Sequence, residues 1–461
     1  RHPLAAQKAH CLENLVIRIQ TMNDTQRPKI AVIGAGWAGL SAAVQLVGRA
    51  DVTLFEAGKQ AGGRARSLEN SNDSFSFLDN GQHIMIGAYR GVLTLMERIG
   101  VRAEEALVRR PLQWHIHEGL QFQTASLPSP WHIAAGILRA DNILLAHKIQ
   151  LLRDMAALQR HHMRKRPDVP VAKWLRDRRT SRKLLAEFWQ PLVWSALNTP
   201  LEDAGLNTLC NVLHDGIWAD KTGSDYLLPK RDLGGIVATP ALDYLRKHGA
   251  SVRLETRVPP LGNLPDGRVD VNSEAFDAAI LATAPYHTAM LLPSSTPEYI
   301  QTAYDHLRYH SVTTVYLRYA KDVKLPAVLT GLADGTAQWL VNRGALGLPA
   351  NEIAAVVSVS DRLHLKNSEF AEKIHADVLR VCPDIGDPVA GRIITEKRAT
   401  AASLAGRTLP DFAWLHHRNI YPAGDYLHPR YPCTLEAAVQ SGAVTADLCL
   451  NELRASPLNL F

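Results

Sequence analysis

One short stretch near the start of the chain constrains the fold more than any other feature. Residues 29–33 (KIAVI) are an apolar run rich in Ile and Val, residues 34–39 (GAGWAG) follow without a gap, and residues 40–47 (LSAAVQLV) have the composition of a helix. A second apolar run, residues 51–55, ends at Glu56. This order predicts a buried parallel strand, a glycine-rich turn, a helix and a second parallel strand. We therefore expect an α/β fold with a Rossmann-like domain.

The glycines of this unit have the spacing of a dinucleotide site. The first permits a tight turn, Gly36 lets the backbone approach a pyrophosphate, and Gly39 lets the helix pack closely on the strand. The helix start offers unpaired backbone N–H groups to a phosphate. Glu56 is placed to accept hydrogen bonds from a ribose. The residues expected to bind the cofactor here are Gly34, Gly36, Trp37, Ala38, Gly39 and Glu56.

The residues after the second strand indicate which dinucleotide cofactor is bound, FAD rather than NAD. Glu56-Ala57 is followed by Gly62-Gly63-Arg64-Ala65-Arg66. This run resembles the FAD-binding motif of the flavin amine oxidase and phytoene desaturase superfamily. The resemblance implies bound FAD, with Ala57, Gly63 and Arg64 beside it; paired glycines allow close approach and Arg64 supplies a cation. No second G-x-G-x-x-G occurs, so no nicotinamide site of the usual kind is visible.

The C-terminal part of the chain carries a second group of residues with the same resemblance. Residues 419–425 (NIYPAGD) predict a strand that ends in a Gly-Asp turn, and residues 432–438 (PCTLEAA) predict the start of a helix. In the superfamily the Gly-Asp pair holds the ribityl–phosphate chain, and the helix N-terminus points at the flavin pyrimidine. The positions this implies are Gly424, Asp425, Thr434 and Leu435. Cys433 lies in the turn, whereas the covalent cysteine of monoamine oxidases precedes theirs, so we expect a noncovalent flavin.

The FAD domain is expected to be assembled from separated segments. Residues 226–229 and a helix predicted over residues 240–248 precede two predicted strands, residues 250–255 and 276–281, and residues 259–270 predict a surface connection between strands. The family brings a backbone segment here, with Val258, over the adenosine. We expect a GR2-type FAD-binding domain and an interleaved α+β substrate domain. The expected boundaries are 29–88, 211–290 and 415–455 for the FAD domain, 89–210 and 291–414 for the substrate domain, and 1–28 for a disordered or non-native arm.

Two further sequence runs point to one branch of this superfamily. Residues 78–83 (LDNGQH) and residues 188–200 (FWQPLVWSALNTP) resemble the squalene-associated branch, the hydroxysqualene dehydroxylases. This implies reductive removal of an allylic hydroxyl, converting hydroxysqualene to squalene as in bacterial-type squalene and hopanoid biosynthesis. It also places three residues at the flavin edge: Asn80, Gly81 and Gln82.

The departing hydroxyl needs an acid, and His83 and Asp79 are the candidates. The structural alternative is that Asp79 caps a turn and His83 packs against the flavin. Trp189 and Trp194 have two interpretations: they face a substrate cation, or they pack in the core. Core packing is favoured. Three other functions stay open: a carotenoid-type desaturase, an amine oxidase, and a flavin-binding scaffold without chemistry.

Composition excludes several other classes of protein. Five scattered cysteines without a C-x-x-C argue against a disulfide scaffold or a zinc ribbon and fit a reducing compartment. His115 with His117, and His306 with His310, lack a third ligand, so we expect no metal. The net charge of +6 is spread along the chain, which does not favour nucleic acid as a partner.

A segment in the middle of the chain suggests where an apolar substrate is loaded. Residues 130–166 predict a helix with an apolar stripe and a basic end over residues 160–166. Such a helix suits the cytoplasmic face of an anionic inner membrane; an ordinary core-facing helix with a solvated basic tip fits equally. The stripe comprises Leu138, Leu145, Ile149, Leu152 and Met155. The expected partners are a long isoprenoid, a membrane surface and upstream squalene-pathway enzymes, and the expected location is the cytoplasm, peripheral to that membrane.

Overall fold

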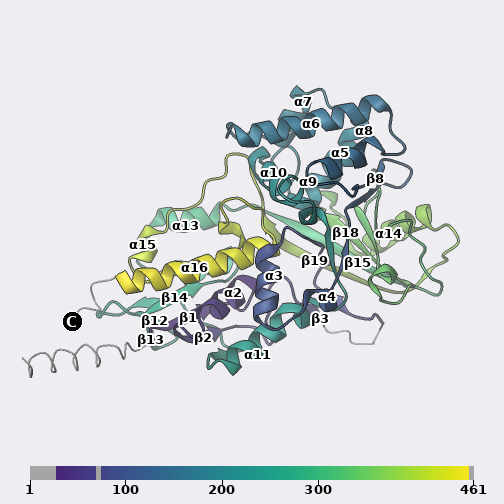
Figure 1. Ribbon diagram of the computed structural model, residues 1–461. Helices are drawn as coiled ribbons and strands as arrows, with labels where there is room; N and C mark the ends of the chain where they lie inside the picture. The colour runs from purple at the N-terminus through teal and green to yellow at the C-terminus, as the bar shows by residue number, and fades with distance from the viewer. Residues whose placement is uncertain (1–26, 69–73, 456–461) are drawn as a thin grey trace, which may run out of the picture.

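The computed structural model describes residues 27–68 and 74–455, and the expected N-terminal arm lies outside them up to residue 26 (Figure 1). The predicted α/β fold is confirmed by a five-stranded parallel sheet. Its strands, in spatial order, are β10 (Ser251–Arg253), β2 (Asp51–Phe55), β1 (Lys29–Ile33), β14 (Ala278–Leu281) and β20 (Ile420–Pro422). Because strands far apart in sequence become neighbours, the first glycine-rich turn is enclosed by later parts of the chain.

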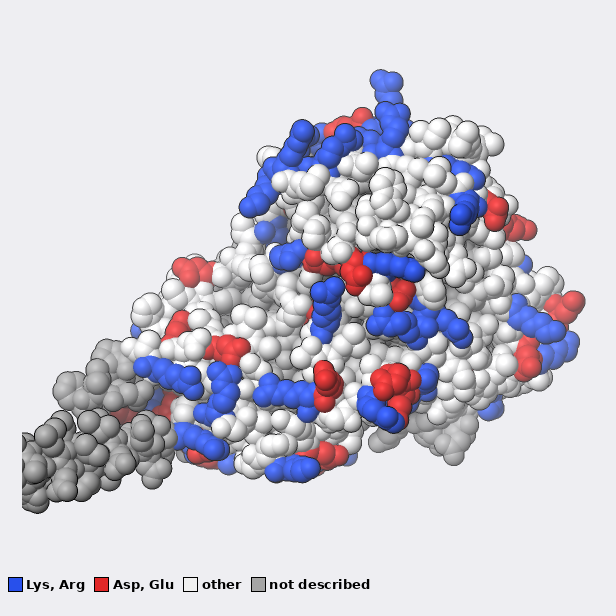
Figure 2. Space-filling model, in the orientation of Figure 1, with Lys and Arg blue, Asp and Glu red and all other residues white. Residues whose placement is uncertain are grey.

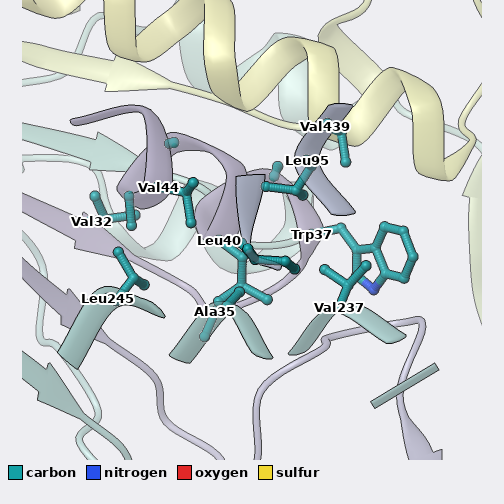
Figure 3. Close-up of a cluster of buried hydrophobic side chains, with 14 of the residues drawn as sticks. Val32, Ala35, Trp37, Leu40, Val44, Leu95, Val237, Leu245 and Val439 are labelled. Atoms are coloured by element: carbon teal, nitrogen blue, oxygen red, sulfur yellow. The ribbon is translucent and has the colours of Figure 1, made fainter. Parts of the chain in front are cut away.

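Two helices from opposite ends of the chain cover this sheet. α2 (Trp37–Leu46) and α16 (Leu435–Ala455) run against each other in Figure 1, and Ser41 Oγ donates to the carbonyl of Val439 at 2.7 Å. The two backbones come so close that a Cβ on Gly442 would lie 2.0 Å from the Ala38 oxygen. The core beneath them is apolar (Figure 3); it includes Val32, Leu40, Val44, Leu95, Val237 and Val439.

A second sheet is antiparallel and lies beside the helical part of the molecule. Its strands, in spatial order, are β16 (Leu329–Gly331), β17 (Trp339–Asn342), β18 (Glu352–Ser358), β15 (Tyr309–Tyr319) and β19 (Pro388–Ala401). The helices at the top of Figure 1 are α5 (Trp131–Leu138), α6 (Leu145–Met163), α7 (Val171–Asp177), α8 (Arg182–Leu184), α9 (Gln190–Leu197) and α10 (Leu206–Leu213). A π-helical turn, η2 (His214–Trp218), continues α10.

The remaining short elements connect these layers. α3 (Arg90–Arg98) packs on α16, and β9 (Tyr226–Pro229) pairs with β5 (Met85–Ile86) and β6 (Leu107–Arg110) rather than with the parallel sheet. α11 (Thr239–Lys247) packs on α2, and α14 (Asn367–Val381) covers the antiparallel sheet. β4 (Leu78–Asp79) precedes the segment expected at the flavin edge.

The expected helix over residues 130–166 is wrong in one respect, because it is interrupted. α5 ends at Leu138 and α6 begins at Leu145. Between them the backbone of Asp141 pairs with that of Gln121, and Asn142 adopts a left-handed conformation with φ of 62°. These backbone bonds replace the helical ones and end α5.

Two smaller expectations in the middle of the chain also need correction. The expected strand 276–281 is two elements, because β13 (Glu274–Phe276) pairs with β12 (Val269–Val271) before β14 begins. The surface connection expected over residues 259–270 contains β11 (Gly262–Asn263) and the start of β12.

Candidate functional site

One cavity of about 1070 Å³ joins the carboxyl end of the parallel sheet to the antiparallel sheet and to α9, α10 and η2. Most residues expected at the cofactor from the sequence line it. They are Gly34, Gly36, Trp37, Ala38, Glu56, Ala57, Gly63, Arg64, Asn80, Gly81, Gln82, Val258, Gly424, Asp425, Thr434 and Leu435, together with His83. Gly39 and Asp79 are not among the lining residues.

The glycine-rich turn leaves a helix end open toward this cavity. α2 begins at Trp37, and its N-cap, Gly36, supplies no side-chain hydrogen bond, so the first N–H groups are free for an anion. Gly63 faces Gly36 across the cavity wall: a Cβ on Gly63 would lie 3.0 Å from the Gly36 Cα. A Cβ on Gly39 would lie 1.8 Å from the Gly34 oxygen, which explains its position behind the wall. Gly36, Gly63 and the open start of α2 together form what we call the glycine cradle. The glycine cradle fits a pyrophosphate.

Glu56 and Arg64 fix the loops on either side of this cradle. Glu56 accepts hydrogen bonds from the backbone N–H groups of Ala35 (2.8 Å) and Gly58 (2.7 Å). Arg64 donates to Asp425 Oδ1 at 2.7 Å and to the Ala399 carbonyl at 2.8 Å. The sequence did not indicate the Arg64–Asp425 ion pair, which ties the double-glycine loop to the Gly-Asp turn.

The start of α16 is anchored at the same wall. Thr434 Oγ1 accepts from the N–H of Ala437 at 3.1 Å, and Glu436 accepts from the N–H groups of Gly91 (2.8 Å) and Val92 (2.9 Å) at the start of α3. Burial raises the pKa of the neighbouring Cys433 thiol to about 12. Cys433 is therefore protonated at neutral pH and is a weak nucleophile.

The two acid candidates lie on opposite sides of the cavity wall. His83 lines the cavity, its Nε2 is buried, and that atom has no partner within the described residues. Burial lowers the pKa of His83 to about 4, so its ring is uncharged at neutral pH. Asp79 lies behind the wall and accepts from the Leu233 N–H at 3.0 Å. Burial raises the pKa of Asp79 to about 7.

The other end of the cavity is lined by apolar and aromatic side chains that the sequence did not single out. Trp114 and Trp339 meet there edge to face, with ring centroids 5.0 Å apart and an interplanar angle of 85°. The remaining apolar lining residues of this end include Leu112, Leu192, Ala196, Val212, Leu213, Ile217, Leu329 and Val356. Trp189 is fully buried in the core, and neither it nor Trp194 is among the lining residues. This end suits an apolar ligand.

Metal chemistry has no support in residues 27–68 and 74–455. Within these ranges there is no group of three or more His, Cys, Asp or Glu side chains that could hold an ion. Two ionisable groups of the cavity are paired within the protein: Glu56 with backbone N–H groups and Arg64 with Asp425.

Comparison with known proteins gives consistent matches. Residues 37–450 match the family described as flavin containing amine oxidoreductase. The hydroxysqualene dehydroxylase of Zymomonas mobilis is 27% identical over 91% of this chain and 98% of its own. The 15-cis-phytoene desaturase of Narcissus pseudonarcissus is 24% identical over 91% of this chain and 79% of its own. Cyclohexylamine oxidase from Brevibacterium oxydans has the same fold, with a TM-score of 0.69 at 14% identity, covering 93% of this chain and all of the other.

Proposed function

The chain belongs to the flavin-containing amine oxidoreductase family, and from that premise we propose that it is a hydroxysqualene dehydroxylase, which removes the allylic hydroxyl of hydroxysqualene and yields squalene. The observation that carries the proposal is one continuous cavity, of which one end is the glycine cradle and the other end is apolar. Full-length similarity to hydroxysqualene dehydroxylases supports the same substrate. The alcohol, one hydride and one proton give the hydrocarbon and water.

The enzyme is an FAD-dependent oxidoreductase, and FAD, when bound and in its reduced form, would supply the hydride. The residues proposed to hold it are those of the cradle, with Gly36 and Gly63 at the pyrophosphate, Glu56 at the ribose and Asp425 at the ribityl chain. The protonated Cys433 supports a noncovalent flavin. Uncapped N–H groups at the start of α2 neutralise the phosphates.

His83 is the residue we propose as proton donor to the departing oxygen. It lines the cavity with an unpaired buried nitrogen, whereas Asp79 does not reach the cavity wall and can act only by positioning the segment that carries His83. Because the pKa of His83 is lowered to about 4, few molecules hold the proton at pH 7, and turnover is expected to rise as the pH falls from 7 toward 5. His83→Asn should lower turnover by roughly 10²–10⁴-fold.

The decisive experiment is an anaerobic single turnover. The purified protein is reduced with dithionite and mixed with hydroxysqualene, and the lipid is extracted while flavin absorbance is followed. Squalene formed in step with flavin oxidation is the expected result. Absence of squalene with the cofactor bound would overturn the proposal.

The alternative functions give different outcomes in the same assay. A desaturase would form product only from the oxidised protein with polyene precursors, and the desaturase relative is the more distant of the two. An amine oxidase would oxidise amines, and a scaffold would not reoxidise with any of these substrates. No feature of the cavity favours these three over the dehydroxylase.

We further propose that the enzyme loads its substrate at a membrane surface through the exposed faces of α5 and α6. In residues 27–68 and 74–455 no helix is long and apolar enough to cross a bilayer. The stripe expected from the sequence divides, because Leu145 and Ile149 are exposed while Met155 is buried in the core. The exposed apolar side chains of these helices and the turn between them are Trp131, Leu138, Leu144, Leu145, Ile149 and Met163. Transfer of a hydrocarbon of this size from water into a bilayer lowers the free energy strongly. This favours loading and release at a membrane surface.

The charge around these side chains supports an anionic bilayer. Figure 2 shows Lys and Arg side chains along the upper edge of the molecule, over α6 and α7 of Figure 1. Arg160, Arg164, Lys165 and Arg166 at the end of α6 are exposed. The same surface would also bring the enzyme near the upstream squalene-pathway enzymes that we expect as partners.

Vesicle co-sedimentation tests the membrane proposal. The holoenzyme is expected to sediment with phosphatidylglycerol-containing vesicles, and the double variant Leu145→Ser/Ile149→Ser should do so several-fold less. The control is Val444→Ser on the exposed side of α16, which should sediment like wild type. Equal sedimentation of wild type and the double variant would contradict the proposed surface.

A further inference from the structure

Ser195 on α9 is a polar residue in the largely apolar wall at the apolar end of the cavity. Leu192, Ser195 and Ala196 are spaced i, i+3 and i+4, so they share one face of the helix, and all three line the cavity. Val193, on the other side of α9, is buried in the core and is not among the lining residues. α9 therefore presents one hydroxyl to the cavity between two apolar side chains.

The Ser195 hydroxyl is held by a buried indole. Trp339 Nε1 donates a hydrogen bond to Ser195 Oγ at 2.6 Å, and Trp339 is only 4% exposed. The ring of Trp339 is itself fixed edge-on against Trp114. Within the described part of the chain the Ser195 O–H has no acceptor, although helical serines often donate to the carbonyl four residues before. Its oxygen accepts from the indole, and its hydrogen remains available to a ligand.

The side chains of two nearby polar wall residues are already engaged. Asn198 donates to the His310 carbonyl (3.4 Å) and to Thr400 Oγ1 (2.9 Å) and accepts from the Val359 N–H (2.8 Å). The Tyr226 hydroxyl donates to a backbone carbonyl at 3.1 Å. Ser195 is thus a hydrogen-bond donor that the indole of Trp339 holds in place and that has no acceptor within the described part of the chain.

Sheet register relates Ser195 to the flavin-edge segment. Trp339 pairs with Val356 across β17 and β18, and Val356 pairs with Thr314 across β18 and β15. Adjacent strands are about 4.8 Å apart, so Trp339 and Thr314 stand roughly 10 Å apart on one row. Thr314 Oγ1 accepts from the N–H of Gln82 at 3.3 Å. The residue that holds Ser195 and the segment that carries His83 are therefore fixed by the same row of the sheet.

We propose that Ser195 recognises the substrate hydroxyl by donating a hydrogen bond to its oxygen, and that Trp339 is a positioning residue acting through Ser195. The identity of the substrate rests on the proposed function. As the C–O bond breaks, its electron pair stays with the oxygen, which takes one proton and leaves as water. A fixed donor stabilises the negative charge that develops on this oxygen. The indole strengthens the donor, because linked hydrogen bonds polarise one another.

Equilibrium binding to the oxidised holoenzyme tests the proposal without turnover. Hydroxysqualene and squalene are titrated in detergent micelles while the visible absorbance of the flavin is followed. Wild type should prefer the alcohol by about 3–10-fold, as expected for one net hydrogen bond. Ser195→Ala should lose this preference with unchanged affinity for squalene, and Ser195→Thr should retain it. Trp339→Phe should lower the preference but have no further effect in the Ser195→Ala background.

Single turnover supplies a second measurement. Ser195→Ala should lower the rate by roughly 10²-fold, the cost of removing one preorganised donor. Flavin content and melting temperature establish that each variant folds. Ser195→Ala with full preference and full rate would overturn the proposal, as would equal loss of affinity for both lipids. A wild type that shows the Ser195-dependent preference but forms no squalene would refute the proposed function and leave hydroxyl recognition standing.

Discussion

The two ends of the cavity are built in different ways. The cofactor end consists largely of backbone: Gly36 and Gly63 face each other, and Glu56 and Arg64 bind neighbouring loops. The substrate end consists of side chains such as Trp339 that α9, η2 and the antiparallel sheet bring together. Backbone cradles need particular residues at fixed spacing, whereas an apolar wall accepts many side chains of suitable size. A site of the first kind can therefore be predicted from a sequence, whereas a site of the second kind tolerates changes in its side chains.

The largest effect is expected at the buried ion pair that ties residues 76–77, ahead of the flavin-edge segment, to the antiparallel sheet. Arg343 and Glu352 are 0% and 2% exposed, with Arg343 Nε 3.1 Å from Glu352 Oε2, and Arg343 also donates to the Phe77 carbonyl at 2.8 Å. Arg343→Met leaves a buried carboxylate without its cation, so urea unfolding should show a loss of about 3–5 kcal/mol. The double variant Arg343→Met/Glu352→Leu should lose less. Equal losses in both would mean that the unpaired carboxylate of Glu352 is not what destabilises the Arg343→Met variant.

A valine at Gly36 should damage the cofactor end alone. Gly36 has an ordinary φ of −71°, and a Cβ there would meet only the Gly63 Cα, at 3.9 Å, so the apoprotein should tolerate the side chain. The added methyls would occupy the space expected for the pyrophosphate. Gly36→Val should weaken FAD binding by about 100-fold, measured by fluorescence titration, with an unchanged melting temperature of the apoprotein. Full FAD content would refute the assignment of the cradle.

A polar residue at Leu192 should damage the substrate end alone. Leu192 lies on the cavity face of α9 and is half-buried. Leu192→Asn removes apolar contact with the lipid, and the KM for hydroxysqualene should rise about tenfold while flavin content stays unchanged. Leu192→Met, of similar volume, should behave like wild type. A parallel loss of flavin would show that the two ends are not independent.

A pH-dependent effect is expected at Asp79, which lies behind the wall. Burial raises its pKa in the folded state to about 7, so between pH 4 and 7 the folded protein keeps a proton that the unfolded chain releases. This contribution makes stability fall as the pH rises through that window and leaves it reduced above pH 7. Asp79→Asn should remove a slope of at most about 1.4 kcal/mol per pH unit, seen in unfolding at pH 5 and 7. An unaltered slope would assign it to other groups.

The same difference explains what the sequence could reveal. Gly34, Glu56 and Asp425 were predicted as cofactor residues because each follows a strand at the spacing of an FAD motif, and all three line the cavity. Ser195 and Trp339 were missed, because 144 residues separate them and only the packing of α9 on β17 brings them together. The break between α5 and α6 was missed for a related reason, since it depends on backbone pairing of Asp141 with Gln121.

The position of β1 has a consequence for biosynthesis. Ile30 pairs with Val52 on one side but with Ala278 on the other, and α2 is covered by α16, the last helix described. The glycine turn cannot be enclosed until the residues of α16, about 400 positions further along, have left the ribosome. Flavin loading is thus a late event, and the nascent chain must keep its first strand–helix unit from aggregating while the partners of that unit are still being translated.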